Sequence, residues 1–147
     1  MTMNRLLLFS VALLACGVMT LTLSGQGTAA GADAKLARGK YLVEEVARCQ
    51  ECHTPKLASG EFDRAQWLKG TTLVYAPSAP ITGWHQKSPD ITSTSGLWKR
   101  WGGVEGFAKF LETAKTPTGG KAGPPMPAYT AKAEDADAMA AYLQSLP

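Results

Sequence analysis

The sequence predicts an all-α fold with long loops, and three observations support this. Apolar residues recur at helical spacing in three segments, 33–48, 101–115 and 130–146. No segment keeps the alternation of a half-buried strand. The middle of the chain, residues 55–100, is rich in Gly, Pro, Ser and Thr, which is typical of connecting loops. With 147 residues, of which 45% are hydrophobic, the chain is long enough for one domain with a modest core.

The first 32 residues have the three-part layout of a secretory signal. A short segment with Arg5 precedes the apolar run LLLFSVALLACGVMTLTL, and small residues follow up to an A-x-A-like site at residues 30–32. We expect cleavage before Asp33, which leaves 33–147 as the folded domain. Two alternatives stay open. The segment Leu6–Leu23 is long enough for an uncleaved anchor helix. The sequence LLAC, ending at Cys16, resembles a bacterial lipobox, in which Cys16 would be lipidated.

Each of these three interpretations exports residues 33–147, so we expect a periplasmic or otherwise exported protein. In the two alternatives it is also anchored to a membrane, by lipid at Cys16 or by the N-terminal helix. Removing residues 1–32 changes the formal net charge from +3 to +2, because Arg5 is lost and no acidic residue is. This small charge, with no run of Lys or Arg, does not indicate nucleic acid binding.

The segment 33–48, DAKLARGKYLVEEVAR, is expected to be the first helix of the domain, with Asp33 as its N-cap. It leads directly into CQECH, which places Cys49, Cys52 and His53 within five residues. Three chemistries would use these residue types: a zinc site, a redox dithiol, or covalent attachment of a haem.

The rest of the chain favours haem. A structural zinc site needs four ligands, usually in two pairs, and outside the signal the chain offers only one further imidazole, His85. A thioredoxin-like dithiol follows a strand, whereas a helix precedes this motif. Haem attachment explains each residue, because the two thiols add to the two vinyl groups and the imidazole binds the iron. We therefore predict one haem c, bound covalently by Cys49 and Cys52, with His53 as an axial ligand.

Met126 is the expected second axial ligand. Of the five methionines, three lie in the signal, and Met139 lies on the apolar stripe of the last helix, where we expect it in the core. Met126 lies in AGPPMPAYT, and the prolines around it fix φ and remove N–H donors, which predicts a stiff, extended loop. Alternatively, Met126 only covers the haem edge. His85 is expected at the surface.

Two more helices are expected after the loop-rich middle. The first is WGGVEGFAKFLETAK, residues 101–115, and the second is TAKAEDADAMAAYLQSL, residues 130–146, with Thr130 as its N-cap. A shorter helix is predicted in FDRAQWLKG, residues 62–70. Five aromatic residues are candidate walls of the haem pocket: Trp98, Trp101, Phe107, Phe110 and Tyr129.

Three segments resemble the class I (monohaem) cytochrome c domain family: ARGKYLVEEVARCQECHTP, GPPMPAY and AEDADAMAAYLQSL. The resemblance covers nearly all of 33–147. More narrowly, RGKYLVE…CHTP, PDIT…GLW and PPMPAY are similar to cytochrome c subunits that accompany periplasmic dehydrogenases. The resemblance implies a cytochrome c-like helical domain with long loops wrapped around one covalently attached haem. It also implies that the first and last helices cross, with Gly39 and Tyr142 at the crossing.

The resemblance implies further roles around the haem. The backbone carbonyl of Pro55 is expected to accept a hydrogen bond from the ring N–H of His53. Relatives often have Asn where this chain has Asp90, with the side chain facing a haem propionate. Because an ionised Asp would repel a propionate, Thr92 is the expected donor instead.

We therefore expect an exported electron carrier and not an enzyme. With both axial positions of the iron occupied, no site remains for a substrate, so the protein would move single electrons. The expected partners are redox proteins, namely a dehydrogenase, an oxidase or other cytochromes. Two alternative functions stay open: a haem enzyme or gas sensor with a labile Met126, and an obligate cytochrome subunit of a dehydrogenase or oxidase complex.

Overall fold

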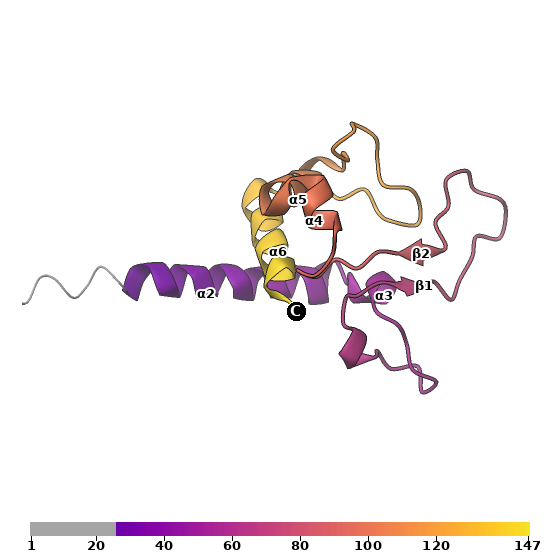
Figure 1. The fold of residues 1–147 in the computed structure, drawn as a ribbon, viewed down its shortest axis with the longest axis horizontal. Helices are drawn as coiled ribbons and strands as arrows, with labels where there is room; N and C mark the ends of the chain where they lie inside the picture. The colour runs from indigo at the N-terminus through magenta and orange to yellow at the C-terminus, as the bar shows by residue number, and fades with distance from the viewer. Residues whose placement is uncertain (1–25) are drawn as a thin grey trace, which may run out of the picture. The chain divides into compact units, whose positions relative to one another are not determined.

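The computed structural model describes residues 26–147 as helices joined by long loops, with one short two-stranded ladder in that range (Figure 1). This confirms the all-α class. The chain divides into two compact units, residues 1–34 and 35–147. The proposed anchor at Leu6–Leu23 and the lipobox cysteine Cys16 lie outside the described residues. Within residues 26–147, no helix is long and apolar enough to cross a bilayer.

The first described helix, α2, is Gln26–Tyr41, and a π-helical turn, η1 (Leu42–Val46), continues it. The expected helix over 33–48 is therefore present. Its expected N-cap at Asp33 is wrong, because α2 already begins at Gln26 and Asp33 lies inside it. The π-helical turn closes with a hydrogen bond from Ala47 N–H to the carbonyl of Leu42, at 2.8 Å, and it buries Leu42 in the core.

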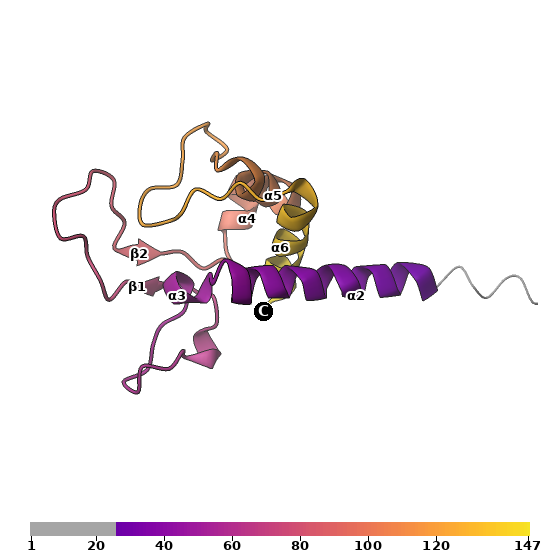
Figure 2. The ribbon, with the colours of Figure 1, turned by 180° about the vertical axis from the view of Figure 1, so that it is seen from behind.

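The last helix, α6 (Ala133–Ser145), crosses α2 (Figures 1 and 2). The contact lies at Gly39, within the unit of residues 35–147. A Cβ placed on Gly39 would lie 2.0 Å from the carbonyl oxygen of Ala138 and 2.7 Å from Cβ of Tyr142. Only glycine allows these backbones to approach so closely, which confirms the expected crossing. The expected N-cap at Thr130 is wrong, because the helix starts one residue after Lys132.

The helix predicted over 101–115 is present as α5 (Gly103–Thr113), with both ends inside the predicted range. A short helix that was not predicted, α4 (Leu97–Trp101), precedes it. Gly102, with φ +81°, separates them in the left-handed conformation. The buried apolar side chains of α4, α5, α6 and η1 form the core together with Leu68 and Ile91 from the loops. Met139 lies in this core with 4% exposure, as expected.

The loop-rich middle contains a short 3-10 helix and a two-stranded ladder. The 3-10 helix η2 (Arg64–Gln66) stands where a short helix was predicted. The strands β1 (Thr71–Thr72) and β2 (Lys87–Ser88) form an antiparallel ladder, which was not predicted because two-residue strands leave no pattern. The long loop 73–86 connects β1 to β2, and the long loop 114–132 connects α5 to α6 (Figures 1 and 2).

Candidate functional site

A cavity of about 260 Å³ lies between α3 (Gln50–His53), β2, α4, α5 and the loop 114–132. Its walls are mainly apolar, and six residues supply most of them: Leu73, Ile91, Leu97, Trp101, Phe107 and Phe110. Cys52, His53 and Met126 also line it. The structure thus brings the predicted iron ligands and one predicted thiol to the same cavity, although Met126 follows His53 by more than seventy residues.

One turn of helix arranges the CQECH motif. Arg48, with φ +52°, turns the chain out of η1. The N–H groups of Cys52 and His53 then donate to the carbonyl of Cys49, at 3.2 and 2.9 Å. Residues three and four apart share one face of a helix, so Cys49, Cys52 and His53 lie together. Cys49 itself packs against the hydrophobic core and is not among the cavity-lining residues.

The thiol of Cys49 does not have the electrostatics of a reactive thiol. Cys49 and Cys52 are both free. Burial raises the pKa of Cys49 to about 12, and the nearby Cys52 adds to that rise. A redox-active C-x-x-C motif needs a thiol whose pKa is lowered. The raised pKa of Cys49 therefore does not support the thioredoxin-like alternative.

His53 is held by a carbonyl other than the expected one. Its side chain is 5% exposed, and Nδ1 lies 2.8 Å from the carbonyl oxygen of Pro89. The expectation for Pro55 is wrong, because the Pro55 carbonyl accepts from the N–H of Asp63, at 2.9 Å. A carbonyl can only accept, so Nδ1 of His53 carries the proton and Nε2 is left as the free ligand atom.

Burial lowers the pKa of His53, while the Pro89 carbonyl and the charge of Asp90 act in the opposite direction. Burial has the larger effect, so the imidazole is neutral near pH 7. A neutral imidazole with one nitrogen already hydrogen-bonded is the form in which histidine binds a metal ion.

Gly70 explains how Pro89 reaches the imidazole. The N–H of Gly70 donates to the carbonyl of His53 at 2.7 Å. Gly70 has φ +83°, and a Cβ on it would lie 2.6 Å from the Ser88 carbonyl oxygen. The β1–β2 ladder pairs Thr71 with Ser88 and so sets Pro89 beside α3. No signal in the sequence marked Pro89, because a backbone carbonyl has no side-chain signature.

The Met126 loop is held against the loop 73–86. The N–H of His85 donates to the carbonyl of Pro124 at 2.8 Å. A Cβ on Gly123 would lie 2.5 Å from both Cδ2 and Nε2 of His85, so the ring lies directly against this glycine. Met126 is half-buried and lines the cavity. His85 is exposed, as expected, but it also lines the cavity, which the sequence did not indicate.

Thr92 does not line the cavity. It is fully buried, and its hydroxyl and N–H both donate to Oδ1 of Asp90, at 2.9 and 2.7 Å. The hydroxyl of Thr94 donates to the other carboxylate oxygen, at 3.2 Å. The structure therefore commits Thr92 to Asp90, and the expected role of Thr92 as a donor to a propionate finds no support in this geometry.

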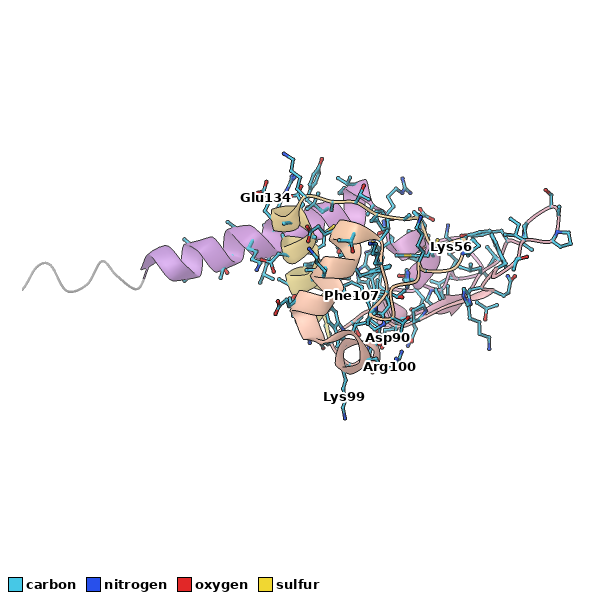
Figure 3. The ribbon with its side chains drawn as sticks, turned by 90° about the horizontal axis from the view of Figure 1, so that it is seen from above. Lys56, Asp90, Lys99, Arg100, Phe107 and Glu134 are labelled. Atoms are coloured by element: carbon cyan, nitrogen blue, oxygen red, sulfur yellow. The ribbon has the colours of Figure 1, made fainter. Side chains whose placement is uncertain are left out.

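Three of the five predicted wall residues line the cavity: Trp101, Phe107 and Phe110 (Phe107 is labelled in Figure 3). The rings of Trp101 and Phe110 meet edge to face with centroids 4.5 Å apart. Trp98 lies in the core and donates to the carbonyl of Thr92 at 2.6 Å. Tyr129 donates to the carbonyl of Ala47 at 3.1 Å.

The residues of the site fit a haem c. A large apolar ring system needs apolar walls, and aromatic and aliphatic side chains supply them. Histidine nitrogen and methionine sulfur are ligands that haem iron can take, and His53 and Met126 lie on the same cavity. Tyr75 was not predicted, and its hydroxyl oxygen lies 3.2 Å from Sγ of Cys52.

Comparison with known proteins agrees with this geometry. A family model described as "Cytochrome c" matches residues 36–147. The chain is 33% identical over 115 residues to a "Diheme cytochrome c-type" protein of Cereibacter sphaeroides, which covers 75% of this chain and 35% of the relative. It is 36% identical over 117 residues to the "Fructose dehydrogenase cytochrome subunit" of Gluconobacter japonicus, covering 75% of this chain and 22% of the relative.

A third relative is the "Alcohol dehydrogenase (quinone), cytochrome c subunit" of Gluconobacter oxydans. It is 34% identical over 122 residues, which cover 78% of this chain and 24% of the relative. The chain therefore spans about a third or less of the length of these curated relatives.

Proposed function

Because the chain belongs to the cytochrome c family of electron-transfer proteins, whose members hold haem c covalently, we propose that it is an exported cytochrome with one haem that carries single electrons. The observation that carries this proposal is the placement of Cys52, His53 and Met126 on one apolar cavity. When bound, haem c supplies the one-electron couple between ferric and ferrous iron. The chain's own residues bind it, orient it and keep water from it.

Each residue of the site has one proposed task. Cys49 and Cys52 hold the haem through thioethers. Nε2 of His53 binds the iron, and the Pro89 carbonyl fixes the ring and makes its nitrogen a stronger donor. Met126 supplies the second axial ligand. A thioether sulfur can only accept a hydrogen bond, so the Tyr75 hydroxyl, 3.2 Å from Sγ of Cys52, would be the donor once that bond forms.

The loop that bears Met126 favours a carrier over a haem enzyme or gas sensor. An enzyme or sensor needs an open position on the iron, so its methionine must leave readily. Here the loop is fastened to the loop 73–86 through His85 and Pro124, and the close contact between His85 and Gly123 leaves no gap there. A fixed loop supports a permanent sulfur ligand.

The partners are proposed to be redox proteins of the dehydrogenase class. The relatives that are named as fructose and alcohol dehydrogenase subunits support this class. They also favour a second candidate function, in which the chain serves as the cytochrome subunit of such a complex. Co-purification from native membranes, followed by identification of the protein that reduces the haem, distinguishes a bound subunit from a free carrier.

The mature N-terminus tests the proposed export. We expect signal removal before Asp33, and the boundary between the two compact units, after Ala34, lies close to that position. Mass spectrometry of the mature protein should find a chain that begins at Asp33. A diacylglyceryl group on Cys16 would instead place the protein on a membrane surface, since the several acyl chains of a lipoprotein give stable anchoring.

An equilibrium redox titration tests the proposed function. The wild-type protein should follow a single one-electron curve, with low-spin spectra in both oxidation states and weak binding of carbon monoxide. A high-spin ferrous form that binds carbon monoxide readily would contradict the carrier and favour the enzyme or sensor. Two overlapping one-electron steps would contradict a single haem.

A further inference from the structure

We propose that Lys87 binds a haem propionate at the rim of the cavity, with His85 beside it as a second polar contact. This inference rests on the proposed haem site and names chain residues that would hold the acidic edge of the cofactor. A haem carries two propionate carboxylates. A carboxylate at the border of an apolar site needs a cation or several hydrogen-bond donors, because its desolvation is otherwise costly.

Most polar side chains on the cavity are already engaged. Nδ1 of His53 donates to Pro89. The hydroxyl of Ser88 accepts from the N–H of Thr71 at 2.9 Å and donates to its carbonyl at 3.2 Å. Sγ of Cys52 lies within hydrogen-bond distance of the Tyr75 hydroxyl. These three groups therefore have little capacity left for a carboxylate.

Lys87 and His85 remain. Both line the cavity, and both have exposed side chains at its solvent side. Lys87 takes part in none of the ion pairs found among residues 26–147. Its backbone is fixed by the pairing with Thr72 in the β1–β2 ladder. The backbone of Lys87 is thus fixed at the cavity by the ladder, and its side chain has no ion-paired carboxylate among residues 26–147.

The acidic residues of the chain do not compete for this cation. No Asp or Glu is among the residues that line the cavity. Asp90 lies three positions after Lys87, but its carboxylate accepts hydrogen bonds from Thr92 and Thr94 and is satisfied by its own segment. The cavity is therefore lined mainly by apolar residues with one lysine and no carboxylate, a composition that suits an apolar ring system with a carboxylate edge.

Trp101 is a neutral donor on the same cavity and offers a different contact for the propionates. The indole of Trp101 lines the cavity and carries an N–H group. If the propionates lay toward α4, this indole and not Lys87 would contact them. The experiment must therefore compare a variant of Lys87 with a variant of Trp101.

Zero-length cross-linking tests the contact directly. First, haem staining of the denatured wild-type protein establishes that haem is covalently bound; its failure would overturn the proposed function and not only this inference. A carbodiimide then joins an amine to a carboxylate in contact with it, with loss of water. We expect the peptide that contains Lys87 to be linked to the haem peptide of Cys49 and Cys52. Lys87→Arg keeps the charge but cannot form this amide, and should abolish the product.

Reduction potentials give a second readout. A positive charge near the iron favours the ferrous form, so Lys87→Gln should lower the midpoint potential and Lys87→Arg should restore it. Lys99→Gln makes the same charge change on a side chain that projects away from the molecule (Figure 3) and should leave the potential close to wild type. Equal shifts in both Gln variants, or a shift in Trp101→Phe with none in Lys87→Gln, would overturn the proposal, as would a Lys87 cross-link only to protein carboxylates.

Discussion

The imidazole of His53 is held by a backbone carbonyl 36 residues further along the chain. That distance in sequence is bridged by Gly70, whose N–H binds the His53 carbonyl and whose missing side chain lets Ser88 and Pro89 come close. At the scale of single residues, the proposed iron ligand therefore depends on a glycine that never touches the iron. A change at Gly70 should therefore alter the reduction potential.

Gly70→Ala should loosen the hydrogen bond between His53 and Pro89. The new Cβ would lie 2.6 Å from the Ser88 carbonyl and the residue would be strained at φ +83°. We expect a loss of stability of about 1–3 kcal/mol and a higher reduction potential, because a less basic imidazole stabilises ferric iron less. Gly60→Ala is the matched control. Gly60 has φ +89°, and no atom lies within 4 Å of a Cβ placed on it. Gly60→Ala therefore introduces the backbone strain without displacing a neighbouring segment. An unchanged potential in Gly70→Ala would contradict this explanation.

Met126 should set the reduction potential and keep the sixth coordination position of the iron occupied. Met126→His should lower the potential and keep a low-spin iron, because imidazole is a stronger donor than a thioether. Met126→Ala should open the sixth position, so that carbon monoxide binds the ferrous form readily and weak peroxidase activity appears. Met139→Leu changes the buried methionine of α6 and should change neither property. Spectra and potentials that stay the same in both Met126 variants would exclude Met126 as a ligand.

The side-chain part of the site could be predicted from the sequence, and the backbone part could not. Cys49, Cys52, His53 and Met126 are marked by residue type and spacing, and the structure gathers them around or beside one cavity. Pro89 was missed because it acts through its carbonyl. Thr92 was chosen from the chemistry of Asp90, but the sequence could not show that its hydroxyl binds Asp90 itself.

At the scale of elements, the crossing of α2 and α6 ties the first described helix to the last one. Gly39 permits the contact with Ala138 and Tyr142, and Arg38 forms two hydrogen bonds with Asp135, at 2.9 and 3.2 Å. The ion pair is exposed and screened by solvent, so the close approach of the backbones carries more of the stability.

Gly39→Ala should destabilise the domain. The new Cβ meets a backbone oxygen at 2.0 Å, which the helices can relieve only by moving apart, and we expect a loss of about 1–3 kcal/mol or more. Gly96→Ala serves as the control, because the atom nearest to a Cβ there is the Arg100 guanidinium at an ordinary 3.7 Å. Denaturant unfolding of both variants, monitored by haem absorbance, measures the difference. If the two variants unfold at the same denaturant concentration, the crossing is not close-packed.

Helical periodicity located the longer helices but not the shortest one. The pattern over 101–115 corresponds to α5, whereas α4, which Gly102 ends in the left-handed conformation, was missed because five residues are too few to show a period. The β1–β2 ladder escaped prediction because two-residue strands are too short to show alternation. The cap at Asp33 was wrong because the helix continues upstream to Gln26, and the cap at Thr130 was wrong because α6 begins only at Ala133.

At the scale of the whole molecule, the hydrophobic core of residues 35–147 and the cavity share residues. Ile91, Leu97, Phe107 and Phe110 belong to the core cluster and also line the cavity. The all-α class and the family could be predicted from the sequence, since a cofactor-filled fold needs few elements and leaves long loops. The identity of a redox partner could not be predicted, because no fixed residue spacing marks a docking surface in the sequence.

Cys49→Ala combined with Cys52→Ala should leave a chain without covalent haem that unfolds at a much lower temperature than wild type. The apolar walls of the cavity would then lack the group that they cover. Circular dichroism during heating measures this, with a Cys49→Ala single variant as an intermediate case that retains one thioether. A double variant as stable as wild type would show that the core does not need the haem.

The most direct test of the central claim is whether haem stays on the chain when the protein is denatured. Wild-type protein is precipitated in acidic acetone, and the intact mass of the precipitated chain is measured. The account predicts that the red colour remains with the protein and that the mature chain is heavier by one haem, with the haem on the peptide that contains Cys49 and Cys52. Haem dissolved in the acetone, with a chain of unmodified mass, would contradict it.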